Sequence, residues 1–171
     1  MIVGNDPVQG AFRWTEQIGR VYLGTLPGAV GNAFVTDVSA DGSTIVGWIH
    51  YDPNEAGDVA FRWTQQQGFE LLFGSPSVLG NSAWGVSADG SVIVGRDTYN
   101  GAFIWAATHG ARNLDQLLED EYGLDLGGFH LTDAHDVSWD GRVVVGGGFY
   151  DGGASGFEAW RLVPEQANLS S

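Results

Sequence analysis

The sequence has 171 residues, of which 43% are hydrophobic and 16% charged, a balance typical of packed globular proteins. Its 21 acidic and seven basic residues give a net charge of −14, which disfavours nucleic acid and anionic membranes as partners, because both are bound through basic side chains. It has no cysteine, which excludes disulfides and thiolate metal sites, and no apolar stretch long enough to span a bilayer.

A short β-branched segment ending in glycine, IVG or VVG, recurs along the chain. Its four glycines are Gly4, Gly47, Gly95 and Gly146. Each segment is followed, after a variable loop, by Ala-Phe-Arg-Trp or a related sequence, at residues 11–14, 60–63, 102–105 and 157–160. A period of about 40 to 50 residues with several strands per unit is typical of a propeller blade.

Each complete unit predicts four short antiparallel strands. The first, inner strand ends in a Val-Ser pair, and a turn containing Asp-Gly follows at residues 41–42, 89–90 and 140–141. Asp-Gly between apolar segments favours a hairpin, because glycine adopts the positive φ that such a turn needs. The IVG segment is then the second strand, the aromatic segment the third, and residues 21–24 or 69–74 the outer strand.

The aromatic residues of the third strands predict the core. Side chains two residues apart in a strand point to the same face, so each Phe-x-Trp pair can pack against a neighbouring sheet. One blade cannot cover its own apolar face, and copies must therefore stack. The expected core residues are Phe12, Trp14, Phe61, Trp63, Phe103, Trp105, Phe157 and Trp160.

The segment NLDQLLEDEYG, residues 113–123, breaks the repeat. Three leucines and Tyr122 are at helical spacing, between a capping Asn113 and a terminating Gly123. This pattern predicts a short amphipathic helix over residues 114–122. We expect it to stand in place of an outer strand and to pack on the barrel edge by its leucines.

The expected fold is therefore all-β: a β-propeller-like array of about four short antiparallel blades, with one short inserted helix. The chain is expected to form a single repeat domain with a tail at 165–171, and its units are 1–31 (partial), 32–79, 80–128 with the helix, and 129–164 (partial). The first unit lacks an inner strand and the last lacks an outer strand, which would expose sheet edges. Association of two chains would cover these edges, which favours a homodimer over a monomer.

The segments VSADGSVIVG, AFRWT and LGTLPG resemble the HAF repeat family of extracellular bacterial proteins and autotransporter passenger regions. The resemblance covers nearly the whole chain, and the part from residue 114 onward is similar to the usual ending of these proteins. It implies a propeller-like fold and an extracellular or cell-surface location, with no catalytic residue or cofactor. Because the family often has more repeats ahead of this ending, the chain is expected to be a C-terminal piece, a short member, or one completed by pairing. Its first ten residues do not have the pattern of a signal peptide.

The inner strands carry the first candidate ligand site. Two residues before each Val-Ser pair stand Thr36, Trp84 and His135, and one residue before it stand Asp37, Gly85 and Asp136. Since side chains alternate, one of these two sets would point into a central channel, where converging polar and aromatic groups are typical of ligand sites. His135 and Asp136 are the most suggestive pair, with His130 nearby. The alternative is that these side chains satisfy strand ends and bond to a neighbouring blade.

Three tryptophans lie outside the repeating aromatic positions: Trp48, Trp84 and Trp139. An exposed indole with polar neighbours can stack on a sugar ring, although burial between blades is the alternative. The candidate ligand-binding residues are therefore Asp37, Trp48, Trp84, His135, Asp136 and Trp139.

Metal binding is not expected. The turn residues Asp41, Asp89 and Asp140 supply one carboxylate per blade, whereas calcium needs several oxygen ligands, so a structural role in the turns is favoured. His50 and His109 lie in predicted loops, and their spacing indicates no shared site.

The sequence contains no Gly-x-Ser-x-Gly, no His-Glu-x-x-His and no phosphate-binding loop. We therefore expect a non-catalytic, propeller-like binding or scaffold domain that binds carbohydrate or protein and needs no cofactor. The alternative is a carbohydrate-active enzyme with a carboxylate pair at the channel mouth, such as Asp133 with Asp136, whose separation would decide the question. A third possibility is a self-assembling fragment whose edges pair with a partner chain.

Overall fold

The computed structural model describes residues 1–52, 57–75, 80–150 and 156–163. Its strands form four antiparallel sheets. Sheet 1 consists of β1 (Ile2–Asp6), β2 (Gly10–Thr15) and β3 (Gly19–Tyr22). Sheet 2 consists of β4 (Ala33–Val38), β5 (Thr44–Asp52), β6 (Gly57–Thr64) and β7 (Gly68–Leu71). Sheet 3 consists of β8 (Asn81–Val86), β9 (Val92–Asp97), β10 (Gly101–Ala106) and β11 (Gly110–Asn113), and is followed by helix α1 (Leu114–Asp120). Sheet 4 consists of β12 (Phe129–Val137), β13 (Val144–Tyr150) and β14 (Glu158–Leu162).

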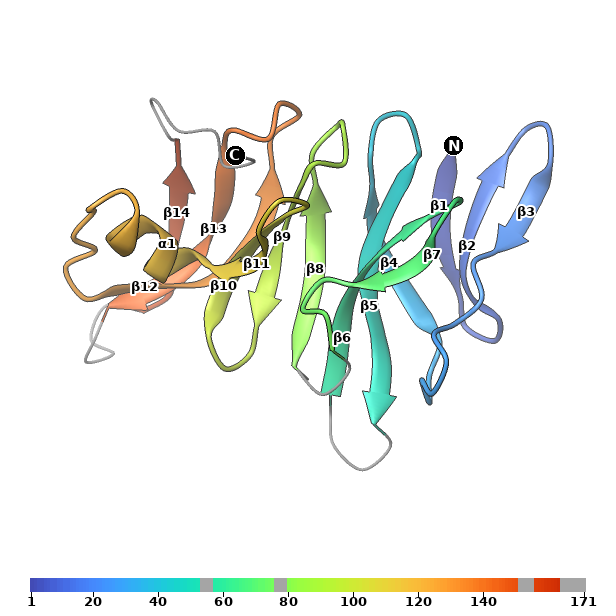
Figure 1. Ribbon diagram of the computed structural model, residues 1–171, viewed down its shortest axis with the longest axis horizontal. Coiled ribbons are helices and arrows are strands. Elements are labelled where there is room, and N and C mark those ends of the chain that lie inside the picture. Colours follow the sequence, from blue (N-terminus) through green and yellow to red (C-terminus); the bar gives the residue numbers. More distant parts are fainter. Residues whose placement is uncertain (53–56, 76–79, 151–155, 164–171) are drawn as a thin grey trace.

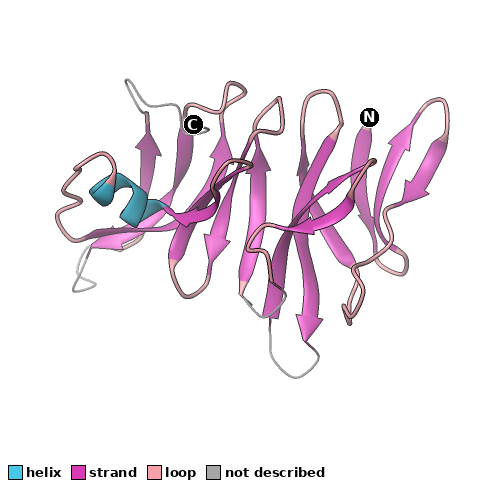
Figure 2. Cartoon of the chain, viewed as in Figure 1, coloured by secondary structure: helices cyan, strands magenta, loops and turns pink. Residues whose placement is uncertain are grey.

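The sheets stack in chain order, as the blades of a propeller do. Contacts join sheet 1 to sheet 2, sheet 2 to sheet 3 and sheet 3 to sheet 4. Sheets 1 and 4 lie at opposite ends of the row (Figure 1), so the described chain is an open array. The fold is therefore all-β with one short helix, as expected from the repeat (Figure 2).

The IVG glycines make room for two neighbours at once. A Cβ on Gly95 would lie 2.1 Å from the carbonyl oxygen of Ser82 in β8 and 2.8 Å from the ring of Phe103 in β10. On Gly47 it would lie 1.9 Å from the Phe34 carbonyl oxygen. In sheets 2, 3 and 4, any larger residue would separate the second strand from the inner strand, which explains the glycine at Gly47, Gly95 and Gly146.

The three Asp-Gly turns share one set of hydrogen bonds. In the second unit, Ser39 Oγ donates to Asp41 Oδ1, the Ser43 amide donates to the same oxygen, and Gly42 has a φ of +74°. The turns of sheets 3 and 4 repeat these bonds at Asp89 and Asp140. The turn aspartates therefore stabilise the hairpin turns by accepting these hydrogen bonds.

Backbone hydrogen bonds also join these turns from sheet to sheet. The Ala40 amide donates to the Ala88 carbonyl at 2.9 Å, and the Ala88 amide donates to the Trp139 carbonyl at 3.0 Å. The turns thus tie sheets 2, 3 and 4 together along one rim of the array.

The predicted aromatic core is confirmed in the two central sheets. Phe61 and Phe103 are 0% and 1% exposed, and Trp63 and Trp105 are 9% and 4% exposed. Trp14, in the first sheet, is 39% exposed because none of the described sheets packs on that face. The prediction of a buried Trp14 is therefore wrong, and Phe12 beside it is half-buried.

The predicted register of the last aromatic segment is also wrong. Trp160 pairs with Gly146, as Phe61 pairs with Gly47, and so takes the place of the phenylalanine. Leu162, opposite Val144, takes the place of the tryptophan. Phe157 falls outside the strand and is 64% exposed, because the FEAW segment has its aromatic residues three apart rather than two.

Helix α1 forms at the expected place but with a different role. It follows the outer strand β11 instead of replacing it, and ends at Asp120. Asn113 Oδ1 accepts the Gln116 amide at the helix start. Leu114, Leu117 and Leu118 join the buried cluster between sheets 3 and 4. The helix therefore covers the interface next to sheet 4, which has no outer strand among the described residues.

Candidate functional site

Each described inner strand has a β-bulge two residues before its Val-Ser pair, at Thr36, Trp84 and His135, and β12 has a second irregularity at Thr132. The bulge turns these side chains toward the neighbouring sheet. The Trp84 indole and the His135 imidazole are stacked, with centroids 5.1 Å apart and planes inclined by 8°. Thr36 Oγ1 donates to the Ala83 carbonyl at 2.8 Å. Two of the predicted site residues are thus brought together across the interface of sheets 3 and 4.

The two predicted aspartates bind backbone amides. Asp37 Oδ1 accepts the Val38 amide at 2.7 Å, and its Oδ2 accepts the Val86 amide of sheet 3 at 2.9 Å. Asp136 Oδ1 accepts the Val137 amide at 2.8 Å. Both carboxylates therefore stabilise the irregular backbone of the bulged strands, which was the structural alternative for these positions.

The other two predicted tryptophans are apart from this pair. Trp48 is half-buried and stacks on Phe34, with ring centroids 4.5 Å apart. Trp139 lies at the tip of a turn, is 76% exposed, and has no aromatic contact among the described residues. The six predicted residues therefore do not form one site.

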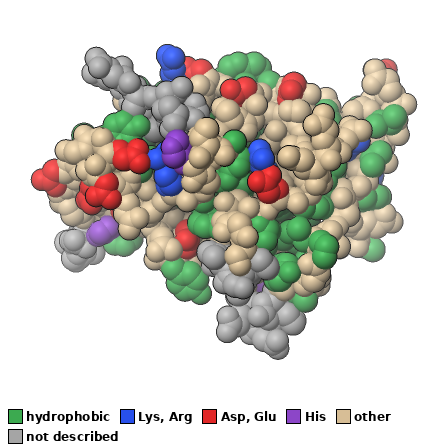
Figure 3. Space-filling model, viewed as in Figure 1, with side chains coloured by type: hydrophobic (Ala, Val, Ile, Leu, Met, Phe, Trp, Pro, Cys, Tyr) green, Lys and Arg blue, Asp and Glu red, His purple; other side chains and the backbone are tan. Residues whose placement is uncertain are grey.

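A hollow at the opposite rim of sheets 3 and 4 gathers a different set of residues. Two adjoining cavities, of about 340 and 350 Å³, share Tyr99, Asn100, Asp115 and His130. Tyr99 and Asn100 come from the β9–β10 turn, Asp115 from the first turn of α1, and His130 from β12. Acidic side chains gather around the helix end of the molecule (Figure 3). The hollow thus offers the aromatic ring of Tyr99 beside several polar groups.

Hydrogen bonds hold the two walls of this hollow. Asp97, 4% exposed, accepts the Tyr99 amide at 2.9 Å and the Asn100 side-chain amide at 2.8 Å, which fixes the turn. Across from it, Asp115 Oδ1 accepts the Leu131 amide at 3.1 Å, and its Oδ2 lies 3.6 Å from His130 Nδ1. Tyr99 itself is 79% exposed.

Burial raises the pKa of Asp115 above its ordinary value, whereas the Leu131 amide and His130 act in the opposite direction. The net effect favours the neutral acid relative to an exposed aspartate. Asp115 is therefore a hydrogen-bond donor over a wider pH range than an ordinary carboxyl group.

The sequence did not indicate this hollow. In the sequence, His130 stands out only as a neighbour of His135, and Tyr99 and Asn100 lie in a variable loop. A tyrosine in a polar turn such as DTYNG can by itself indicate a candidate binding surface. Its partners are 16 to 31 positions further on, however, and only the stacking of sheets 3 and 4 brings them together.

The remaining chemical candidates lie elsewhere. Asp133 is buried and faces Arg96, with 3.5 Å between Oδ1 and Nε, whereas Asp136 is exposed at a bulge. His50 Nδ1 lies 3.2 Å from Asp58 Oδ1. Within the described residues, no three His, Asp or Glu side chains are grouped as a metal site, and no helix is long and apolar enough to cross a membrane.

No family model, curated protein or solved structure matches this chain. The resemblance to the HAF repeat family stays a prediction.

Proposed function

We propose that this protein is a non-catalytic binding domain whose stacked sheets present the hollow at Tyr99 to a carbohydrate. The extracellular or cell-surface location implied by the HAF-like segments belongs to the same proposal. The observation that carries it is the exposed Tyr99 ring next to Asn100, Asp115 and His130.

The chemistry of the hollow suits a sugar ring. A pyranose has an apolar face, which stacks on an aromatic side chain, and hydroxyl groups, which need donors and acceptors around the rim. Asn100 supplies an amide, Asp115 a carboxyl group, and Gln116 a second amide. Asp97 fixes the turn that carries Tyr99, so the aromatic face is positioned before a ligand arrives.

The carboxylates of the inner strands support binding rather than catalysis. Asp37 and Asp136 accept backbone amides, so their oxygens are already engaged in hydrogen bonds within the protein. The alternative function, a carbohydrate-active enzyme, is favoured by one observation: the raised pKa of Asp115 suits a general acid. Its buried neighbour Asp97 already accepts two hydrogen bonds, which leaves it poorly placed to serve as the second carboxylate.

The binding proposal is tested with an array of neutral and acidic oligosaccharides probed with the labelled protein. The expected result is retention of at least one glycan, with retention lost in Tyr99→Ala. Tyr122→Ala is the matched control, because Tyr122 is also exposed but is absent from the lining of the hollow. Retention unchanged in Tyr99→Ala, or no retained glycan, would contradict the proposal. Release of reducing sugar from a retained glycan, lost in Asp115→Asn, would favour the enzyme instead.

A further inference from the structure

The interfaces of sheet 1 with sheet 2 and of sheet 2 with sheet 3 repeat one pairing of two different sheet faces. In the third interface, Ile104 of sheet 3 and Leu162 of sheet 4 stand in place of the arginine and the tryptophan. The face toward the preceding sheet carries the isoleucine of IVG and, across from it, the tryptophan: Ile45 pairs with Trp63, and Ile93 with Trp105. The face toward the following sheet carries the valine of IVG and, across from it, an arginine: Val3 pairs with Arg13, and Val46 with Arg62.

These two faces meet through an arginine and a tryptophan. The guanidinium carbon of Arg13 in sheet 1 lies 5.2 Å from the ring centroid of Trp63 in sheet 2. In the next interface, Arg62 lies 4.5 Å from Trp105. Arg13 Nη1 also donates to Gln65 Oε1 at 2.9 Å. A guanidinium over an indole, with a polar acceptor two residues beyond it, therefore joins sheets 1 and 2.

At the two ends of the array, the arginine and the tryptophan of this contact occur without each other: sheet 4 carries the arginine and sheet 1 carries the tryptophan. In sheet 4, Arg161 pairs with Val145 in the register of Arg13 and Val3. Arg161 is exposed and has no ion pair or aromatic partner among the described residues. Val145 is 39% exposed, whereas its equivalent Val46 in sheet 2 is completely buried.

At the other end, sheet 1 presents the receiving half. Trp14 pairs with Ile2 in the register of Trp63 and Ile45. Trp14 is 39% exposed and Ile2 is 58% exposed, whereas Ile45 is completely buried. Glu16 stands two residues after Trp14, as Gln65 stands after Trp63, so this end offers a carboxylate where the internal interface has an amide. The charges of Arg161 and Glu16 are complementary.

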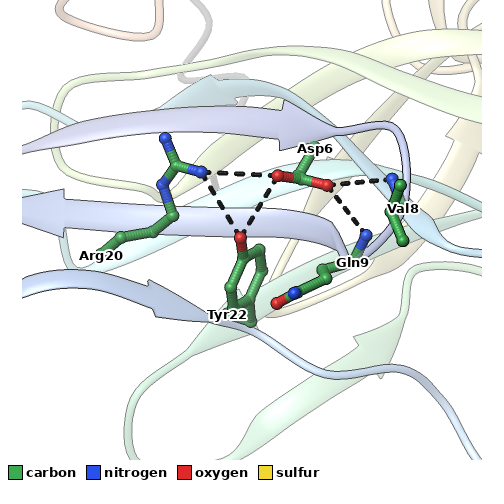
Figure 4. A network of polar contacts seen from close by, with 5 residues as sticks. All are labelled: Asp6, Val8, Gln9, Arg20 and Tyr22. Carbon is green, nitrogen blue, oxygen red and sulfur yellow. Dashed lines mark hydrogen bonds and ion pairs between the residues drawn. The ribbon is translucent and has the colours of Figure 1, made fainter.

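Polar residues cover another part of the same face of sheet 1. Asp6, Arg20 and Tyr22 form the network in Figure 4, in which Arg20 Nη1 and Tyr22 Oη both approach Asp6 Oδ2. By register, Asp6 replaces Ile49 and Arg20 replaces Phe69. These polar side chains reduce the exposed apolar area at this end of the array, and leave Trp14 and Ile2 as its apolar contact area.

We propose that sheet 4 of one copy docks on sheet 1 of a second copy, with Arg161 over the Trp14 ring and donating to Glu16. The contact repeats the interface that joins sheets 1, 2 and 3 within the chain, which is why a second copy fits it. Because the two faces differ, it is head-to-tail and closes into a ring only if its rotation allows. The net charge of −14 opposes association, so physiological ionic strength is the appropriate condition.

Cysteine variants test the geometry directly, because the natural chain contains no cysteine. Ile2→Cys and Val145→Cys, which lie on the two proposed contact faces and leave Arg161 and Trp14 in place, are prepared separately, mixed, and treated with a short thiol-reactive cross-linker. The proposal predicts a cross-linked species in the mixture and little in either variant alone. The variant Arg13→Cys/Gln65→Cys calibrates the reagent within one chain, because these side chains touch across an interface. Cross-linking of either variant with itself, but not in the mixture, would overturn the head-to-tail arrangement.

Charge reversal tests the same contact in solution by light scattering over a range of protein concentrations. Arg161→Glu is expected to weaken association at least tenfold, and Arg161→Glu/Glu16→Arg to restore it. Arg142→Glu is the control, because this exposed arginine lies in a turn of the same sheet. Circular dichroism establishes that each variant is folded. A strictly monomeric natural chain at high concentration, or association insensitive to Arg161→Glu, would overturn the proposal and assign the end faces to another partner.

Discussion

The guanidinium of Arg62 lies over the ring of Trp105, 4.5 Å from its centroid, and so joins sheet 2 to sheet 3. The same guanidinium binds Glu70 through Nη2 at 2.6 Å and Nε at 2.8 Å. Arg62 thus binds the outer strand β7 through Glu70 and also contacts sheet 3 through Trp105. Because Trp105 is buried, the contact with the indole is more strongly desolvated than the contact with Glu70.

Arg62→Met separates these two contributions. It keeps an unbranched stem on Trp105 but removes the charge, and we expect the free energy of unfolding in urea to fall by about 1 to 2 kcal/mol. Glu70→Gln is the comparison, since it removes only the exposed ion pair and should cost about 0.5 kcal/mol. Equal effects of the two substitutions would show that the arginine acts through Glu70 alone.

Gly95→Ala tests why glycine ends the IVG segment. The new Cβ would lie 2.1 Å from the Ser82 carbonyl oxygen, so two paired strands would have to separate. We expect a loss of about 2 to 3 kcal/mol in the free energy of unfolding. Gly4→Ala is the matched control, because the atoms nearest to its Cβ belong to the ring of Phe12, in a sheet with no inner strand among the described residues. This control should cost about 1 kcal/mol or less. Similar costs at the two positions would contradict the explanation.

The lowered pKa values of the turn aspartates predict how the free energy of unfolding depends on pH. The Ser91 amide, with the Ser87 and Ser91 hydroxyls, lowers the pKa of Asp89, and equivalent bonds lower the pKa of Asp41 and Asp140. A group whose pKa is lower when folded stabilises the protein above its unfolded pKa, here near 3.8. This stability is lost as the pH falls through the folded pKa.

Urea unfolding between pH 7 and pH 2 measures this loss. Asp89→Asn should be less stable at pH 7 and should lose less stability on acidification, because the amide does not titrate. Glu119→Gln provides the control for removal of an exposed carboxylate outside the turns. A pH dependence identical in Asp89→Asn and the natural chain would mean that the turns do not contribute.

Helix α1 is expected to stabilise the interface between sheets 3 and 4 through its leucines. Leu117 is 4% exposed in the cluster that this interface shares with the helix. Leu117→Ala should lower the thermal midpoint and the free energy of unfolding, the latter by about 2 to 4 kcal/mol. Glu119→Ala, on the exposed side, should change it by less than about 0.5 kcal/mol. Unchanged stability in Leu117→Ala would show that the helix is peripheral.

The repeat was enough to predict sheets, turns and the buried centre. Asp-Gly turns, IVG strands and Phe-x-Trp pairs each follow from local chemistry, and Phe61 and Phe103 are buried as expected. The prediction was wrong at the ends of the array, because a pattern reports which face is apolar but not whether a neighbour covers it. Trp14 has the same local sequence as Trp63 and a different environment.

The candidate site was less predictable than the fold. The alternation of side chains does not reveal a β-bulge, and the bulges decide that Trp84 meets His135 while Asp37 binds a backbone amide. The hollow at Tyr99 depends on where α1 packs, and the sequence placed this helix in an outer-strand position. Sites built across an interface therefore need the packing of two units, which no single repeat encodes.

The stacking of the four sheets in chain order is most directly measured by nuclear Overhauser effects between methyl and aromatic protons. We predict cross-peaks of Ala11 with Phe61, of Val46 with Phe103, and of Val94 with Trp160, because each pair belongs to one cluster between consecutive sheets. Cross-peaks that instead join Phe61 or Phe103 to sheet 4 would indicate a two-layer sandwich and contradict the account.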